Sequence, residues 1–286
     1  MTSTRSVFGS ARQLLLSSHP GPTAAVTLLS LVLGVAIGLE PWRLVVLTLA
    51  VLAGQLSIGF SNDAIDASRD IAVGRTDKPI ATGAIGRRTV GWAAAIALVV
   101  ALILSGVLGL GMLLAHVVLI GGGWAYNAWL KRTAFSVVPF IVSFGTLPSL
   151  ATLSAVDPRV AALWAGLTGA VLGISIHFTN ALPDLADDQR TGVSGLPHRL
   201  GRRTAGVVAF AALAAGALVV LIGPISLGAE LTPLAVVGFV VTLVLASTGA
   251  FLALRRPANR VLFRLVMAAG LLIAVQLAFG GVRLIA

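Results

Sequence analysis

The sequence predicts an all-α membrane protein of about nine transmembrane helices, since a helix of roughly 20 apolar residues crosses a bilayer. Three observations predict this fold class. Hydrophobic residues make up 57% of the 286-residue chain, charged residues make up only 10%, and long apolar stretches recur along it. Soluble domains carry about 25% charged residues. We therefore predict a polytopic membrane protein rather than a soluble one.

The predicted spans follow one another along the whole chain. They are residues 21–38, 43–61, 89–108, 110–128, 135–153, 159–181, 203–223, 231–254 and 261–284. Residues 1–20 are more polar and contain no small-residue cleavage site, so we expect a retained leader rather than a signal peptide. Residues 1–286 then form a single transmembrane domain that begins with this leader.

The basic residues predict the orientation. All 20 Lys and Arg residues except Arg43, Arg159 and Arg283 lie in the leader, in the connections after the second, fourth, sixth and eighth spans or, for Arg203 and Arg264, at the start of the span that follows such a connection. Because Lys and Arg accumulate on the cytoplasmic side of a membrane, we expect a cytoplasmic N-terminus and an external C-terminus. The long polar connections after the second and sixth spans face the cytoplasm as well, so we expect the active site there.

Composition also excludes several classes of protein. The chain contains no Cys, which excludes disulfide frameworks, thiolate catalysis, zinc–thiolate sites and iron–sulfur clusters. The net charge of +10 does not indicate nucleic-acid binding, because little polar surface is left to carry a basic patch. Arg far outnumbers Lys and Ala is abundant, a bias typical of GC-rich genomes, so we expect a bacterial cell membrane.

Acidic residues concentrate at the inner ends of the second and sixth spans. At 100° per helical residue, each cluster lies on one face of a helix end. The members are Asp63, Asp66 and Asp70 in the first acidic window, and Asp184, Asp187 and Asp188 in the second.

These two windows favour a metal–diphosphate site over two solvated helix ends. An acidic residue at membrane depth costs up to about 3 kcal/mol, and clustered carboxylates raise one another's pKa values unless a cation neutralises them. Mg²⁺ binds one or two carboxylates together with waters and phosphate oxygens. We therefore expect two Mg²⁺ ions that bridge a diphosphate.

The spacing of the windows predicts an internal repeat. Asp63 and Asp184 are 121 residues apart, and each window follows an even-numbered span and precedes a basic loop. We predict two parallel four-helix repeats followed by one further helix, with the acidic faces meeting across a central cavity. No glycine-rich phosphate loop is present, so metals and cations must hold the anion. Both lysines of the chain, Lys78 and Lys131, lie in the loops that would face it.

The motifs resemble those of the UbiA superfamily of intramembrane prenyltransferases. The run NDAIDASRD from Asn62 to Asp70 matches the family pattern N-D-x-x-D-x-x-x-D, and DLADD from Asp184 to Asp188 resembles its second Asp motif. Lys78-Pro79 with Gly83 resembles the basic loop after the first motif, and Tyr126 with Lys131-Arg132 resembles the Tyr–Lys/Arg motif. The resemblance covers the whole chain.

Two positions depart from the family pattern. Many members carry Arg-Pro before the first span, where this chain has His19-Pro20. A basic residue often follows the glycine after the second Asp motif, where this chain has Val193 and Ser194. Both departures concern contacts to the acceptor or the phosphates rather than the metal sites.

The resemblance implies a nine-helix bundle with a polar pocket that faces the cytoplasm. Mg²⁺ on the Asp motifs would bind a prenyl diphosphate, an apolar tunnel would take its tail, and a small-molecule acceptor, usually aromatic, would capture the allylic carbocation. The metal ligands would be Asn62, Asp63, Asp66, Asp70, Asn180, Asp184 and Asp188, with Asp187 added by the acidic pattern. The diphosphate would contact Arg75, Lys78, Lys131, Arg132 and Arg190. The residues expected to be catalytic are Tyr126, Lys131, Asp66 and Asp184.

Several alternatives stay open at this point. A terpene cyclase of the same superfamily would use the same ionisation and quench the cation internally. A secondary transporter would place its ionisable residues near the bilayer midplane, whereas these lie at helix ends. The motifs do not define the acceptor, which could be a quinone precursor, a porphyrin, or a sugar or glycerol phosphate. They also leave open the prenyl length, the oligomeric state and the roles of His19, His177 and Arg283.

Overall fold

The computed structural model describes residues 3–190, 192–255, 260–279 and 284, and all regular elements in these ranges are helical. A helix covers most of each of the nine predicted spans. These helices are α2 (Pro20–Ala36), α3 (Pro41–Ala72), α4 (Arg87–Leu108), α5 (Leu110–Ala128), α6 (Val138–Thr152), α7 (Leu163–Ala181), α9 (Leu196–Ile222), α10 (Pro233–Arg255) and α11 (Arg260–Phe279). Shorter elements are α1 (Ser3–Ser17), α8 (Leu185–Arg190) and the 3₁₀ turns η1 (Leu130–Arg132), η2 (Leu182–Asp184) and η3 (Pro224–Leu227).

Six helices of the described residues are long and apolar enough to cross a membrane: α3, α4, α5, α7, α9 and α10. A seventh is obtained if α1 and α2, which meet at a bend of 73°, count as one broken span. Helix α6 has only 15 residues. The fold is therefore an all-helical membrane architecture with six candidate spans, while the count of nine crossings and the division into repeats stay predictions.

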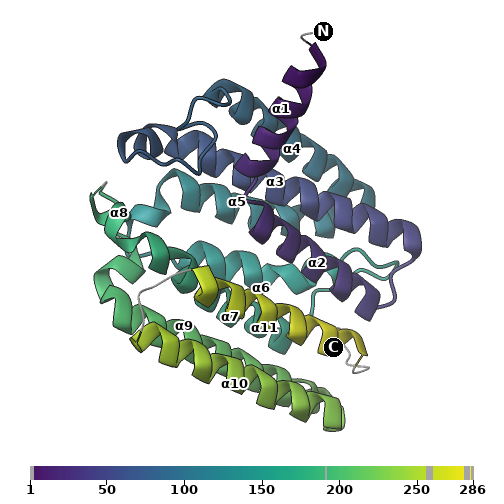
Figure 1. The fold of residues 1–286 in the computed structure, drawn as a ribbon. Helices are drawn as coiled ribbons and strands as arrows, with labels where there is room; N and C mark the ends of the chain where they lie inside the picture. The colour runs from purple at the N-terminus through teal and green to yellow at the C-terminus, as the bar shows by residue number, and fades with distance from the viewer. Residues whose placement is uncertain (1–2, 191, 256–259, 280–283, 285–286) are drawn as a thin grey trace.

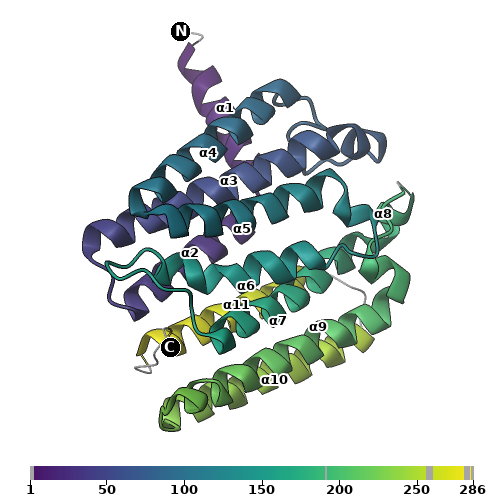
Figure 2. The ribbon, with the colours of Figure 1, turned by 180° about the vertical axis from the view of Figure 1, so that it is seen from behind.

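The helices form a bundle that closes on itself. Helix α3 packs against α2, α4 and α5, and α6 packs against α5 and α7. Helix α9 lies between α7 and α10, and α11 contacts α2, α7 and α10. Figures 1 and 2 show α11 running between α10 and α2, so that the last long helix meets the first.

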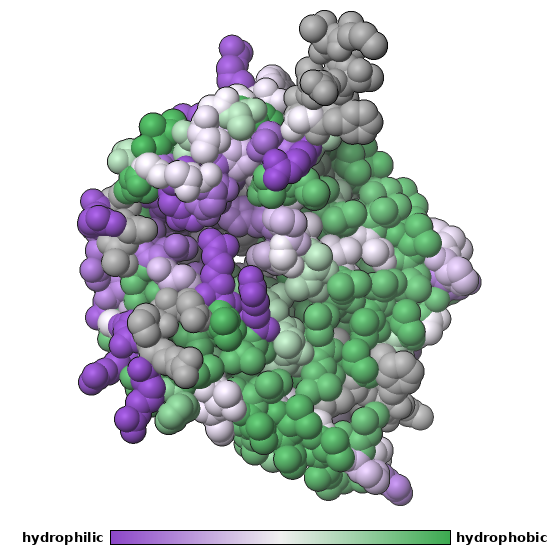
Figure 3. Space-filling model, viewed as in Figure 1, coloured by the Kyte–Doolittle hydropathy of each residue, from purple (hydrophilic) through white to green (hydrophobic). Residues whose placement is uncertain are grey.

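Polar side chains gather at one end of this bundle. In Figure 3 the hydrophilic surface lies on the side where Figure 1 places α8 and the connection between α3 and α4, and the hydrophobic surface covers the rest of this face. Helix α3 extends beyond its predicted end at residue 61 and carries the first acidic window to this polar end. It ends at Ala72, and two residues later Gly74 has a φ of 67°, a left-handed conformation that glycine adopts readily after a helix C-terminus.

The contact between α6 and α7 depends on glycine. A Cβ atom on Gly173 would overlap the backbone carbonyl of Phe140 on α6. Small residues at such crossings let membrane helices approach closely. This approach fixes Phe140 beside the polar end of α7.

We expect Gly173→Ala to lower stability by about 1–3 kcal/mol, since an added methyl in a packed contact forces the backbones apart. The measurement is the thermal unfolding midpoint of the purified protein in detergent. Gly106→Ala on α4 is the matched control, because a Cβ there meets nothing within 4 Å. An unchanged midpoint in Gly173→Ala would contradict the close contact.

Candidate active site

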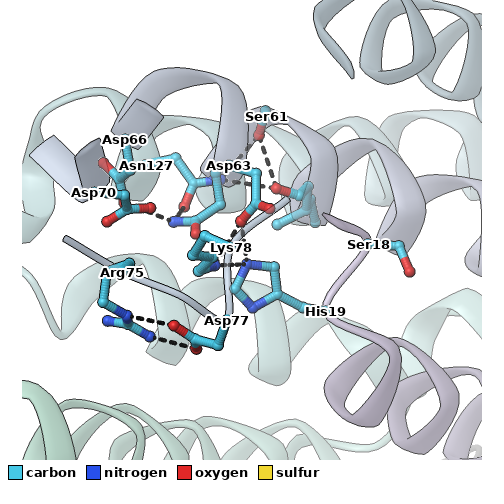
Figure 4. Close-up of polar contacts among 12 residues, drawn as sticks. Ser18, His19, Ser61, Asp63, Asp66, Asp70, Arg75, Asp77, Lys78 and Asn127 are labelled. Carbon is cyan, nitrogen blue, oxygen red and sulfur yellow. Dashed lines mark hydrogen bonds and ion pairs between the residues drawn. The ribbon is translucent and has the colours of Figure 1, made fainter. Parts of the chain in front are cut away.

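The first acidic window is buried and paired with cations. Asp63 is 2% exposed. Its Oδ1 atom accepts hydrogen bonds from Lys78 Nζ at 2.5 Å and lies 3.0 Å from His19 Nε2. Figure 4 shows these three side chains, from α3, the following loop and the bend before α2, pointing toward one another. A carboxylate from the helix and a lysine from the loop are thus held together.

His19 reaches this cluster from a strained backbone position. It has a φ of 53°, the only positive value at a non-glycine residue in the described chain. A left-handed conformation costs about 1–2 kcal/mol for such a residue. Ser18 beside it is fully buried against Gly59 of α3, where a Cβ atom would overlap the Ser18 backbone. Close packing of the bend on α3 therefore holds His19 beside Asp63.

The other two aspartates of the first window share Arg69. Asp66 is 3% exposed and pairs with Lys131 of η1 and, at 3.0 Å, with Arg69 Nη2. Asp70 is equally buried and lies 3.5 Å from the same Nη2 atom. Lys131 is itself only 4% exposed. Burial lowers the pKa of the Lys131 ammonium, and the neighbouring Asp66 carboxylate opposes that shift.

Two arginines connect the first acidic window to the second. Arg69 Nη1 lies 3.4 Å from Asp188 Oδ1, and Arg75 Nη1 lies 3.6 Å from Asp184 Oδ1. Asp188 also lies 3.2 Å from His198 Nε2 of α9. Carboxylates from the end of α3 and from η2 and α8, which follow α7, therefore face a shared set of cations.

Asp77 orients Arg75 in this arrangement. Arg75 donates two hydrogen bonds to Asp77, at 2.8 and 2.9 Å. They raise the pKa of the Arg75 guanidinium and lower the pKa of the Asp77 carboxyl. Asp77 also lies 3.7 Å from Arg260 Nη2 at the start of α11. The loop after α3 thus contacts both η2 and α11.

Amide side chains fix α3 against α5. Asn62 donates to Asn127 Oδ1 at 3.1 Å, and Asn127 donates to Ser61 Oγ at 2.9 Å and to the Ile58 carbonyl at 3.0 Å. Asn127 is 3% exposed and follows Tyr126 directly. This network sets the position of Tyr126 relative to the first acidic window.

Three rings lie next to the ion pairs. Tyr126 contacts Phe140 and His177 edge-on, with ring centroids 5.0 and 5.7 Å apart, and Phe140 lies 4.8 Å from His177. His177 Nε2 lies 3.0 Å from Ser136 Oγ, which accepts the Leu196 N–H at 2.8 Å. We call Tyr126, Phe140 and His177 the aromatic cluster.

An apolar cavity lies inside the bundle, near the aromatic cluster but not lined by it. It lies between α2, α6, α7 and α11 and is partly open to the outside. Phe144 and Ile176 line it, and Phe144 stacks on Phe140 at 6.3 Å. An anionic head at the ion pairs and an apolar tail in the cavity would therefore suit one amphipathic ligand.

The structure brings together most of the residues that the sequence singled out. Asp63, Asp66, Asp70, Asp184, Asp188, Asn62, Arg75, Lys78, Tyr126 and Lys131 lie in or beside the paired cluster. Three others are exposed at its edge: Arg132, Asn180 and Arg190. The side chain of Asp187 and all of Arg283 lie outside the described part of the structure. Sequence reasoning missed Arg69, Asn127 and His198; only Arg69 has a local signal, its spacing of three residues from Asp66 on one helix.

The chemical type of the oxygen donors, aspartate carboxylates, is suitable for Mg²⁺. Asp63 Oδ2 is buried and has no hydrogen-bond partner among the described residues, and carboxylate oxygens are the ligands that Mg²⁺ prefers. Among those same residues, however, no three His, Asp or Glu side chains are close enough together to hold one ion. The carboxylates face Lys and Arg instead, so a metal would have to displace these cations from them.

The fold and the site define a polytopic helical membrane protein with a charged cluster at one end of the bundle, above an apolar cavity. The chain belongs to the UbiA prenyltransferase family, whose model matches residues 23–279. It is therefore a prenyltransferase with the membrane fold of that family.

One curated relative is protoheme IX farnesyltransferase 1 of Paramagnetospirillum magneticum. The two chains are 34% identical over 192 residues, which cover 60% of this chain and 62% of the relative. The match thus spans less than two thirds of the relative's length.

Solved structures of UbiA homologues have the same fold. A homologue from Archaeoglobus fulgidus bound to GPP and Mg²⁺ superposes with a TM-score of 0.70 at 16% identity, covering 94% of this chain and 99% of the homologue. A homologue from Aeropyrum pernix K1 gives a TM-score of 0.72 at 16% identity, covering 87% and 95% of the two chains. At these identities the likeness concerns the fold alone.

Proposed function

We propose that the chain transfers an isoprenoid from a prenyl diphosphate to an aromatic small-molecule acceptor, with Mg²⁺ as cofactor. The observation that carries this proposal is the meeting of the two acidic windows, through Arg69 and Arg75, above an apolar cavity. The A. fulgidus homologue bound to GPP and Mg²⁺ supports the donor class and the metal.

In this proposal the carboxylates hold the metal and the cations hold the diphosphate. Bound Mg²⁺ would neutralise the charge of the carboxylates and of the leaving diphosphate. Its proposed ligands are Asn62, Asp63, Asp66, Asp70, Asn180, Asp184, Asp187 and Asp188. The proposed diphosphate contacts are Arg75, Lys78, Lys131, Arg132 and Arg190. Lys78 pairs with Asp63 and Lys131 with Asp66. When a metal binds these carboxylates, both ammonium groups would be released and could contact the diphosphate instead.

The reaction then needs few further groups. The allylic C–O bond breaks, and its electron pair leaves with the diphosphate, whose charge the fixed cations stabilise. The positive carbon lies beside the aromatic cluster, where ring faces attract a cation. A nucleophilic carbon of the acceptor forms the new C–C bond and then loses a proton. The apolar surroundings keep water away from the carbocation.

The proposal also includes the membrane topology. We propose nine crossings by one transmembrane domain of two four-helix repeats and a final helix, in a bacterial cell membrane with a cytoplasmic N-terminus, an external C-terminus and a cytoplasmic site. The asymmetric distribution of Lys and Arg supports this orientation.

The acceptor can be identified directly. Membranes that contain the protein, Mg²⁺ and farnesyl or geranylgeranyl diphosphate are incubated with no acceptor, with protoheme IX, or with aromatic quinone precursors such as hydroxybenzoate. The relative's name makes protoheme the first probe. We expect a conjugate, detected by mass spectrometry, only when acceptor is present, and its loss in EDTA with recovery on adding Mg²⁺. A hydrocarbon formed without acceptor would show a cyclase instead, and full activity in EDTA would contradict the metal.

A further inference from the structure

Helix α1 lies across the bundle instead of along it. It meets α2 at a bend of 73°, and Figures 1 and 2 both show it leaving the bundle beside α4, with its first turn farthest away. The bend itself is packed: Ser17 and Ser18 are fully buried, and Thr23 of α2 donates a hydrogen bond to the Ser18 carbonyl at 2.8 Å. Because the candidate membrane spans run along the bundle, α1 lies close to the plane of the membrane.

The contacts of α1 place it where the surface of α4 changes from charged to apolar. Leu14 packs against a buried cluster that includes Val90 of α4. Helix α4 begins with the exposed cations Arg87 and Arg88, and from Trp92 onward its large exposed residues are apolar. Trp is enriched at the interface between hydrocarbon and headgroups. The level of Val90 is therefore the level of this interface, and α1 lies there.

The described residues of α1 form an apolar face and a polar face. Ala11 and Leu15 are four residues apart and share one side of the helix, and both are exposed, Leu15 to 59%. Gly9 and Gln13 share another side, roughly 160° around the axis from the first. Leu14 holds the helix against the bundle. This division is typical of helices that lie in the plane of a membrane interface with the apolar face toward the lipid.

The surface around α1 is positively charged. Arg12 is exposed between the two faces of α1, and Arg87 and Arg88 are exposed on the neighbouring α4. Neither residues 1–39 nor residues 78–156 contain any Asp or Glu. Basic residues beside a membrane are attracted by the negative surface potential of anionic lipids. The charge of this surface is thus complementary to an anionic leaflet.

We propose that α1 is a surface helix that binds anionic lipid headgroups of the leaflet at the charged end of the bundle. Ala11 and Leu15 enter the lipid, Arg12 contacts the headgroups, and Gly9 and Gln13 face water. The alternative, in which α1 continues α2 as one broken span, would place Arg12 in hydrocarbon at a cost of about 3 kcal/mol. The proposed reaction does not require this lipid contact, so the two proposals stand independently.

Labels at single positions test the depth of each face. The chain contains no Cys, so one introduced cysteine carries a fluorescent label at a chosen site. Ala11→Cys and Leu15→Cys label the apolar face, and Gly9→Cys and Gln13→Cys label the polar face. Gly9 tolerates the change, because a Cβ there meets nothing within 4 Å. Each full-length protein is studied in phosphatidylcholine nanodiscs with and without phosphatidylglycerol, using aqueous iodide and lipids spin-labelled at the headgroup or at the chain end as quenchers.

We expect headgroup-labelled lipids to quench the two labels on the apolar face, and iodide to quench the two on the polar face. Phosphatidylglycerol should increase the lipid quenching at position 15. Arg12→Gln should reduce that increase, since one Arg at an anionic surface favours binding by roughly fivefold. Arg159→Gln is the matched control, because Arg159 is exposed beside the start of α7, away from the charged cluster; it should leave the quenching unchanged.

Three results would overturn the inference. Quenching of all four labels by iodide alone would show that α1 lies in water. Quenching of all four by lipids labelled at the chain end would show that α1 is part of a span. Lipid quenching at position 15 that is independent of both phosphatidylglycerol and Arg12 would show that apolar contact alone holds α1, and that the recognition of anionic headgroups is wrong.

Discussion

Asp66→Asn is expected to reduce consumption of prenyl diphosphate by about a thousandfold or more, since removing one fixed group that stabilises developing charge already costs about 10²–10³. Asn keeps the shape of the side chain but removes the charge that would hold a metal. The charge also balances Lys131 and Arg69. The measurement is diphosphate release by the variant per inserted, monodisperse protein. Asp157→Asn is the control, because Asp157 is exposed and pairs with Arg159.

Asp184→Asn, in the second acidic window, should reduce consumption of prenyl diphosphate by a similar factor. If both windows act on one diphosphate, the double variant should be little worse than either single variant, because groups that act as a unit are not additive. A double variant that still consumed prenyl diphosphate would contradict the assignment of both windows.

Lys131→Gln is expected to lower turnover by about 10²–10³, the usual effect of losing one donor to a charged leaving group. Removing one partner of a buried ion pair also destabilises a protein by about 3–5 kcal/mol, so turnover is compared per folded molecule. Arg88→Gln, at an exposed position at the start of α4, should keep wild-type turnover. Wild-type turnover in Lys131→Gln would mean that Lys131 only balances the charge of Asp66.

The main parts of the site were predictable because they are encoded locally. Asp63, Asp66 and Asp70 share a helix face through their spacing alone. Lys78 and Lys131 stood out as the only lysines in an arginine-rich chain. The end of α3 could also be predicted from the sequence, because Gly74 is the first residue after the first acidic window that favours a left-handed conformation.

The remaining parts depend on how distant helices pack. Arg69 bridges to Asp188, 119 positions later in the sequence, and nothing near Arg69 indicates that partner. His198 reaches Asp188 from the start of α9. Leu284 lines a cavity whose other walls come from four helices. Hydropathy predicts where these helices lie in the sequence but not which of their faces meet, so these contacts required the structure.

The central claim is that the two acidic windows bind divalent metal together with a diphosphate. The most direct test counts Mn²⁺ ions bound per chain in nanodiscs, with and without inorganic diphosphate, for the wild type, Asp66→Asn and Asp184→Asn. We expect about two ions per wild-type chain when diphosphate is present, as in two-metal sites, and fewer in each variant. Diphosphate that binds equally well in EDTA, with no metal retained, would show that Lys and Arg hold the anion alone and would contradict a shared metal–diphosphate site.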